Sequence, residues 1–190
     1  MLVDGIAVSH PVQAWIECGE LLAPRDLIVM ADGLVRRKAP FATIADLVVA
    51  VECRPRHRGI VALRTVLPHV RAGADSAMES LLRLALIECG FPEPAVNLPI
   101  PDRWGHVIAR GDLVWIEPRI ILEYEGDHHR RDPRQFAIDI DRVGLLESLG
   151  WRVIRVDAAL FRRRGVLIDR IRAAWRQSGL DLPVEVTKIR

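Results

Sequence analysis

The sequence predicts a mixed α/β domain preceded by a small helical region. Residues 1–73 hold short helical patterns that are separated by Pro, Gly and charged residues. After the small residues of "RAGAD", which contain Gly73, the order becomes helix, strands, helix, strand, helix. Half of the 190 residues are apolar, which is enough to bury a sizeable core. We therefore expect a helical region over 1–73, an α/β domain over 74–180 and a tail over 181–190.

The spacing of apolar and capping residues predicts the helices of the helical region and the start of the α/β domain. The helical patterns are "VQAWIECGELL", "DLIVMADGLV", "TIADLVVAVEC" and "IVALRTVLPHV". The first helix of the α/β domain, "SAMESLLRLALIECG", has capping-box spacing between Ser76 and Glu79 and stops at Gly90. Two strands follow, "HVIARGDLVWI" and "RIILEYEG", and they are joined around Glu117 and Pro118.

The rest of the domain alternates helix and strand. Pro133 predicts the first position of a helix that ends at Gly150 and carries an apolar stripe of Phe136, Ile140, Val143 and Leu146. "WRVIRVD" has the composition of a strand. "VLIDRIRAAWRQSG" predicts an amphipathic helix with a glycine stop.

Composition and charge exclude several classes of protein. No apolar run approaches the roughly 18 residues of a membrane helix, and an acid stands where a signal peptide would be basic, so we expect a cytoplasmic protein. Cys18, Cys53 and Cys89 form no CxxC pair, which favours neither disulfides nor a thiolate zinc site. Residues 1–125 hold 13 Lys/Arg and 16 Asp/Glu, whereas 126–190 hold 14 and 9. The basic end fits either a polyanionic partner or a solvated helix face.

The predicted hairpin brings two carboxylates together. A turn centred between Glu117 and Pro118 pairs residues whose numbers sum to 235, so Asp112 lies opposite Glu123. Two opposed carboxylates repel each other unless a positive group lies between them, and Mg²⁺ or Mn²⁺ suits such oxygen ligands. Glu125 lies on the same face as Glu123, within reach of the same ion. The sequence therefore predicts a metal site at Asp112 and Glu123.

Some of these acids also have ordinary structural explanations. The same register places Arg110 opposite Glu125, which predicts a cross-strand ion pair as an alternative role for Glu125. Glu79 has a local role if it completes the capping box. Asp139 and Arg142 share a face of the next helix, away from the Phe136 stripe. Three roles are expected for this pair: a surface ion pair, a support for the site, or a contact with phosphate.

Two adjacent histidines follow the second strand. His128 and His129 cannot easily chelate one ion from a regular backbone, so a zinc site is the weaker hypothesis. Because imidazole titrates near neutral pH, either histidine beside a metal is a candidate general base or a proton donor to the leaving oxygen.

The ordered motifs "ESLLR", "GDLVW", "ILEYEGDHH", "QFAIDIDR" and "LLESLGWRVIRV" resemble the actinobacterial endonuclease-like domains related to very-short-patch repair endonucleases, within the PD-(D/E)XK superfamily. The resemblance covers about residues 75–178. The helical stretch before it looks like the segment that precedes this domain in proteins labelled abortive-infection type IV antitoxin-like. The resemblance implies a restriction-endonuclease-like, four-stranded mixed sheet flanked by helices, with the metal at its acidic edge.

The resemblance also implies roles for individual residues. Asp112 and Glu123 match the superfamily's strand acids, and Glu79 matches the helix acid that completes the site in many members. Glu125 stands where the superfamily usually has lysine, so Arg110, His128 or the metal would replace that lysine. The relatives use histidine near this place, which makes His128 and His129 candidate catalytic residues.

The expected function is Mg²⁺- or Mn²⁺-dependent hydrolysis of DNA, in repair or in defence against foreign DNA. The arginines expected to grip backbone phosphates are Arg130, Arg131, Arg134, Arg142 and Arg155. One alternative is an inactive nuclease fold that binds DNA or acts as an antitoxin-like regulator. A second is an interaction protein that associates with itself, as a homodimer for example, through its acidic and basic halves.

Overall fold

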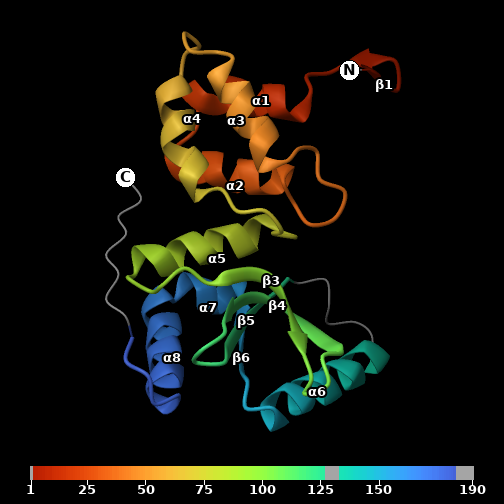
Figure 1. Cartoon of the computed structure of the whole chain (residues 1–190), viewed down its shortest axis with the longest axis vertical. Coiled ribbons are helices and arrows are strands. Elements are labelled where there is room, and N and C mark those ends of the chain that lie inside the picture. Colours follow the sequence, from red (N-terminus) through yellow and green to blue (C-terminus); the bar gives the residue numbers. More distant parts are fainter. Residues whose placement is uncertain (1, 127–132, 183–190) are drawn as a thin grey trace. The chain divides into compact units, whose positions relative to one another are not determined.

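The computed structural model describes residues 2–126 and 133–182 and divides into two compact units, one up to Leu81 and one from Leu82 (Figure 1). The division falls inside helix α5 (Ala77–Glu88), eight residues after the boundary expected at residue 73. In the described part of the chain, no helix combines the length and apolar character needed to cross a membrane.

The first unit consists of short helices after a small hairpin. Its elements are β1 (Leu2–Val3), β2 (Ile6–Ala7), α1 (Pro11–Glu17), η1 (Cys18–Glu20), α2 (Pro24–Leu34), α3 (Ile44–Glu52), α4 (Ile60–Val66) and η2 (Leu67–His69). Proline at the first position starts α1 and α2, and Thr43 forms a complete capping box with Asp46 at the start of α3. Hydrogen bonds from Thr43 lower the pKa of Asp46 below its usual value. The indole of Trp15, fully buried in the core, donates to the carbonyl of Leu27 at 3.0 Å.

A close approach of two glycines holds α4 against η1. Gly59 precedes α4 with a φ of +74°, and a β-carbon there would lie 2.2 Å from the carbonyl carbon of Gly19. Backbone atoms cannot move aside as a flexible side chain can. Only glycine therefore fits at position 59.

We expect Gly59→Ala to lower the free energy of unfolding by at least about 2 kcal/mol, because left-handed strain and the backbone clash add. Urea unfolding followed by tryptophan fluorescence measures this change. Gly33→Ala is the control, because a β-carbon on Gly33 in α2 meets no atom within 4 Å. Its stability should stay equal or rise by up to about 1 kcal/mol. Equal losses in both variants would contradict the close-packing argument.

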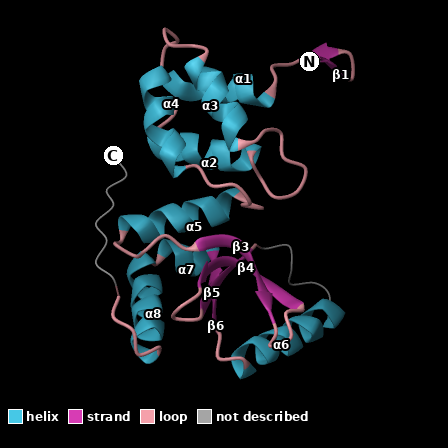
Figure 2. Ribbon diagram, viewed as in Figure 1, coloured by secondary structure: helices cyan, strands magenta, loops and turns pink. Residues whose placement is uncertain are grey.

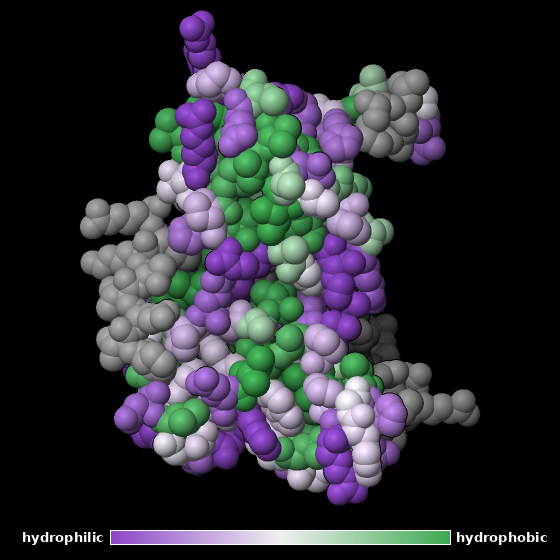
Figure 3. Space-filling view, in the orientation of Figure 1, coloured by the Kyte–Doolittle hydropathy of each residue, from purple (hydrophilic) through white to green (hydrophobic). Residues whose placement is uncertain are grey.

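Some large apolar side chains remain exposed on the first unit, and Figure 3 shows hydrophobic residues between hydrophilic ones over its helices. Leu21 is 75% exposed and Val61 is 73% exposed. Scattered exposure of this kind is common on protein surfaces and does not by itself indicate a partner. The expected homodimer therefore stays a prediction.

The second unit is a four-stranded mixed sheet with helices on both faces (Figure 2). After α5 come β3 (Ala95–Pro101), β4 (Val107–Trp115), β5 (Ile120–Glu125), α6 (Pro133–Ser148), β6 (Arg152–Asp157), α7 (Ala158–Arg162) and α8 (Arg164–Gln177). The strand order is β3-β4-β5-β6, antiparallel except for the parallel pair β5 and β6, whose connection contains α6. The predicted mixed α/β fold class, with a four-stranded mixed sheet flanked by helices, is confirmed.

Each face of the sheet has its own apolar core. On one face, the rings of Phe91, Trp115 and Trp175 pack with centroids 5.3 to 6.3 Å apart, next to side chains of α7 and α8. On the other face, Leu146 of α6 packs with Val114 and Ile121. Figure 1 shows α6 and α8 on opposite sides of the sheet. Leu122, next to Ile121, belongs to the first core, so Ile121 and Glu123 alternate with it and face α6.

Two details of this unit differ from the sequence analysis. No strand was predicted at Ala95–Pro101, and this segment is in fact an edge strand, the position at which a sheet tolerates Pro99 and Pro101. The predicted apolar stripe of α6 is also partly wrong. Ile140 is 55% exposed, whereas Leu146 is fully buried, so the face that includes Leu146 covers the sheet.

Candidate functional site

The β4–β5 hairpin has the register that was predicted. Its pairs are Leu113 with Leu122, Val114 with Ile121, and Trp115 with Ile120, and each pair of numbers sums to 235. The turn closes with a hydrogen bond from the Arg119 amide to the Ile116 carbonyl at 3.1 Å, so its centre lies between Glu117 and Pro118. The ladder ends at Leu113 and Leu122. The next positions on the two strands are Asp112 and Glu123.

Asp112 closes the end of this ladder with its side chain. Its Oδ2 accepts a hydrogen bond from the Tyr124 amide at 2.8 Å, where the ladder no longer supplies a backbone acceptor. The neighbouring strand is also irregular here, since Asn97 of β3 has a φ of +49°. The Asp112 carboxylate is thereby held against the backbone of the residue after Glu123, and the two acids belong to one site.

The positive group at this site is a guanidinium. Glu123 is only 9% exposed, and its Oε1 and Oε2 accept hydrogen bonds from Arg142 Nη1 and Nη2 at 2.5 and 2.9 Å. Arg142 also lies 3.6 Å from a carboxylate oxygen of Asp139, three residues earlier on α6. This bidentate pair is the strongest form of ion pair between side chains. Asp139 and Arg142 are therefore part of the site rather than only a surface pair.

The electrostatics of Arg142 show how acidic its surroundings are. Hydrogen bonding to Glu123 raises the pKa of Arg142 above its usual value, burial opposes this rise, and the charges of Glu123, Asp139 and Asp112 add to it. Three carboxylates therefore act on one cation. The repulsion expected between Asp112 and Glu123 is relieved here by Arg142.

Glu125 has a different partner from the one considered in the sequence analysis. Arg155 of β6 lies 2.9 Å from its carboxylate, and both side chains are about one-third exposed. Arg110 instead donates a hydrogen bond to the backbone carbonyl of Asn97. The prediction of a cross-strand ion pair between Arg110 and Glu125 is therefore wrong. Glu125 is thus neutralised from the parallel neighbouring strand.

Glu79 has the local role that its spacing predicts. Its two carboxylate oxygens accept hydrogen bonds from the Asp75 amide and the Ser76 hydroxyl, each at 2.9 Å, and its own amide donates to Ser76 at 3.2 Å. This is a helix cap, and it lies in the first unit. A catalytic role for Glu79 stays a prediction.

Several candidate residues lie outside the described part of the structure. His128, His129, Arg130 and Arg131 fall between residues 127 and 132, and the side chain of Arg134 is likewise not described. Their proposed roles as general bases and phosphate contacts stay predictions.

The described residues supply two carboxylates for a metal ion. No group of three or more His, Cys, Asp or Glu side chains with metal-binding geometry occurs within residues 2–126 and 133–182. Mg²⁺ needs less than this, because it is commonly held by one or two carboxylates together with water and substrate phosphate. Asp112 and Glu123 have suitable oxygen donors, and the Arg142 cation is hydrogen-bonded to Glu123 and is influenced by the charge of Asp112. They fit a metal on the condition that Arg142 releases Glu123.

Sequence reasoning missed how strongly the two arginines engage the acids. Arg142 is 19 residues from Glu123 along the chain, and Arg155 reaches Glu125 across a helix-containing crossover. The available signal was the spacing of Asp139, Arg142 and Leu146, which places all three on one helical face. Burial of Leu146 turns that face toward the sheet.

The chain is similar to two proteins of Mycobacterium tuberculosis, one from strain CDC 1551 and one from strain H37Rv, both described as uncharacterized. Each is 33% identical over 171 residues, which is 89% of this chain and 62% of the relative. The chain therefore spans less than two thirds of the length of these relatives. No protein-family model matches the chain. No solved structure matches it either.

Proposed function

We propose that the second unit is a metal-dependent DNA endonuclease domain that acts in the cytoplasm, in DNA repair or against foreign DNA. The observation that carries the proposal is the position of Asp112 and Glu123 side by side on adjacent strands of a mixed sheet, where the charges of both act on Arg142. The ordered motifs that resemble very-short-patch repair endonucleases support it independently.

In this proposal Asp112 and Glu123 hold Mg²⁺ or Mn²⁺ and Arg142 binds the substrate. A bound metal of this kind supplies an activated water and offsets negative charge on the phosphate. Arg142 must leave Glu123 first, and it remains charged when it does so, because a guanidinium does not lose its proton in proteins. In this proposal its new partner is a phosphate oxygen of the substrate, to which it can donate two hydrogen bonds as it does to Glu123.

The group that accepts the proton is either Glu125 or one of the histidines after it. Glu125 follows Glu123 by two residues on the same strand and is about one-third exposed, so solvent and substrate can reach it. Its pairing with Arg155 keeps the carboxylate oriented. His128 and His129, which come two and three residues after Gly126 in the sequence, are the alternative bases.

A second candidate function is a nuclease-like domain that binds DNA without cutting it, as an antitoxin-like regulator would. The ion pairs favour this alternative, since Arg142 occupies both oxygens of Glu123 and Arg155 neutralises Glu125. In that case Arg142 is a permanent replacement for the metal rather than a group that moves.

Cleavage assays separate the two functions. Supercoiled plasmid and labelled mismatched or single-stranded oligonucleotides are incubated with the purified chain in Mg²⁺, in Mn²⁺ or in EDTA. The endonuclease proposal predicts nicking with metal and none in EDTA. Absence of cleavage with every metal, together with salt-sensitive binding of the same DNA, would contradict it and support the regulator.

A further inference from the structure

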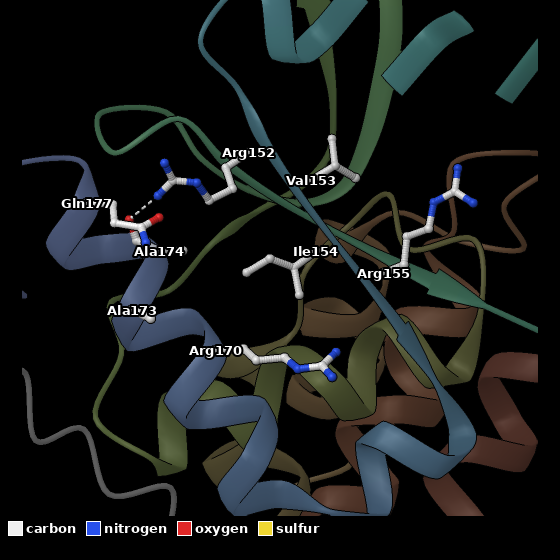
Figure 4. Close-up of a pocket in the computed structure, with 8 residues that line it drawn as sticks. All are labelled: Arg152, Val153, Ile154, Arg155, Arg170, Ala173, Ala174 and Gln177. Atoms are coloured by element: carbon white, nitrogen blue, oxygen red, sulfur yellow. Dashed lines mark hydrogen bonds between the residues drawn. The ribbon is translucent and has the colours of Figure 1, made fainter. Parts of the chain in front are cut away.

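A pocket of about 530 Å³ lies between the edge strand β6 and helix α8, in the second unit (Figure 4). The strand and the helix each contribute four lining residues, which are Arg152, Val153, Ile154, Arg155, Arg170, Ala173, Ala174 and Gln177. Three of the eight are arginines and none is acidic. An open pocket with this lining favours an anion.

The three arginines are held in different ways. Arg152 Nη1 donates to the Ala174 carbonyl at 2.8 Å, which fixes this guanidinium between the strand and the helix. Arg170 is exposed on α8 and makes no ion pair with a described residue. Figure 4 shows Arg152 and Arg170 reaching toward the space between β6 and α8, whereas Arg155 points to the other side of the strand. Arg170 is therefore the arginine most available to a ligand.

The pocket lies on the α8 face of the sheet and the acidic site lies on the α6 face, and β6 contributes residues to both. Arg155 is the residue of β6 that pairs with Glu123 in the parallel register, and its side chain forms the ion pair with Glu125. The pocket and the acidic site thus share one strand. Because β6 is the last strand of the described sheet, its outer backbone groups also face away from any sheet neighbour. A polyanion that passes over the free edge of β6 would reach the pocket on one face of the sheet and the acids on the other.

We infer that the pocket between β6 and α8 binds a backbone phosphate of the nucleic acid whose neighbouring segment occupies the acidic site, with Arg170 as the main contact. The identity of this ligand rests on the proposed function. Arg152 lines the site but mainly joins strand to helix, so it is unsuitable for a first test.

The test compares Arg170→Gln with Arg172→Gln. Both arginines are exposed on α8 and both substitutions remove one positive charge, but Arg172 does not line the pocket. Anisotropy of a labelled DNA duplex is measured in EDTA, so that cleavage cannot contribute. We expect Arg170→Gln to weaken binding about three- to tenfold and to reduce the slope of log K against log salt by about 0.9, with a smaller effect for Arg172→Gln. Equal effects of the two variants would overturn the inference.

A second arm distinguishes nucleic acid from a small anion. Inorganic phosphate is titrated into the wild type and into Arg170→Gln by calorimetry. Phosphate binding that depends on Arg170, without any change in duplex binding, would mark a small-anion site and overturn the inference. Duplex binding that depends on Arg170 supports it, whether or not the protein cleaves DNA in Mg²⁺. If the wild type cleaves DNA but Arg170→Gln binds the duplex as well as the wild type does, the nuclease proposal stays intact. The role of the pocket as a phosphate site is then refuted.

Discussion

Cleavage of supercoiled plasmid in Mg²⁺ is expected to fall at least about a hundredfold when Asp112 is replaced by asparagine or Glu123 by glutamine. Both substitutions keep the size of the side chain and remove its charge, so metal binding and the stabilisation that depends on it are lost. A metal supplies several kcal/mol of transition-state stabilisation, and each 1.4 kcal/mol is about a factor of ten in rate.

The Asp112→Asn variant is the cleaner of the two, because an amide oxygen can still accept the hydrogen bond from the Tyr124 amide. Glu123→Gln also disturbs the pair with Arg142, so its melting temperature must be compared with that of the wild type. Glu147→Gln, an exposed acid on α6, is the matched control and should cleave normally. Full activity in Asp112→Asn would exclude Asp112 as a metal ligand.

Arg142→Ala is expected to lower the free energy of unfolding by about 2 to 4 kcal/mol. The substitution leaves the Glu123 carboxylate, which is 9% exposed, without the two hydrogen bonds that Arg142 donates. Loss of one partner of a buried ion pair costs about 3 to 5 kcal/mol, and the partial exposure of Arg142 places this case toward the lower end. Urea unfolding without metal measures the loss.

Metal gives the same variant a second readout. If Arg142 and a metal compete for Glu123, then Mg²⁺ or Mn²⁺ should raise the melting temperature of Arg142→Ala more than that of the wild type. Arg172→Ala removes an exposed arginine of α8 and should change stability by less than about 0.5 kcal/mol, with no gain in metal response. A destabilised Arg142→Ala that does not respond to either metal would favour the inactive, DNA-binding function.

These experiments also separate two roles of Arg142. If it moves from Glu123 to phosphate, Arg142→Lys should retain part of the activity, since lysine keeps the charge but not the bidentate geometry. If Arg142 permanently replaces the metal, neither Arg142→Ala nor Arg142→Lys should cleave DNA. Each variant should then differ from the wild type only in a lower stability. Activity and stability measured together therefore identify the role.

Features that depend on nearby residues could be predicted from the sequence. The capping box of Ser76 and Glu79 and the turn at Glu117 and Pro118 each involve groups within a few residues of one another. The alternation of helix and strand was sufficient for the fold class. The hairpin register then followed from the position of its turn, because residues in a strand pair have a fixed spacing.

Features that join distant segments could not be predicted in the same way. No strand was predicted at Ala95–Pro101, and the edge position in the sheet is what makes a strand with two prolines acceptable there. Ile140 fits a helical stripe by spacing, yet the packing of Leu146 turns Ile140 outward. Helical spacing is compatible with several apolar faces on α6, and packing against the sheet decides which of them is buried.

The sequence by itself determined the fold class, the hairpin register and the position of Asp112 and Glu123 side by side, just beyond the last paired residues of β4 and β5. Only the tertiary structure decided which cation they meet. Arg142 reaches Glu123, and Arg155 reaches Glu125, because the chain crosses over through α6 and returns as the parallel strand β6. Ion pairs across such a crossover depend on strand order and on the orientation of a whole helix. Neither can be read from the spacing of neighbouring residues.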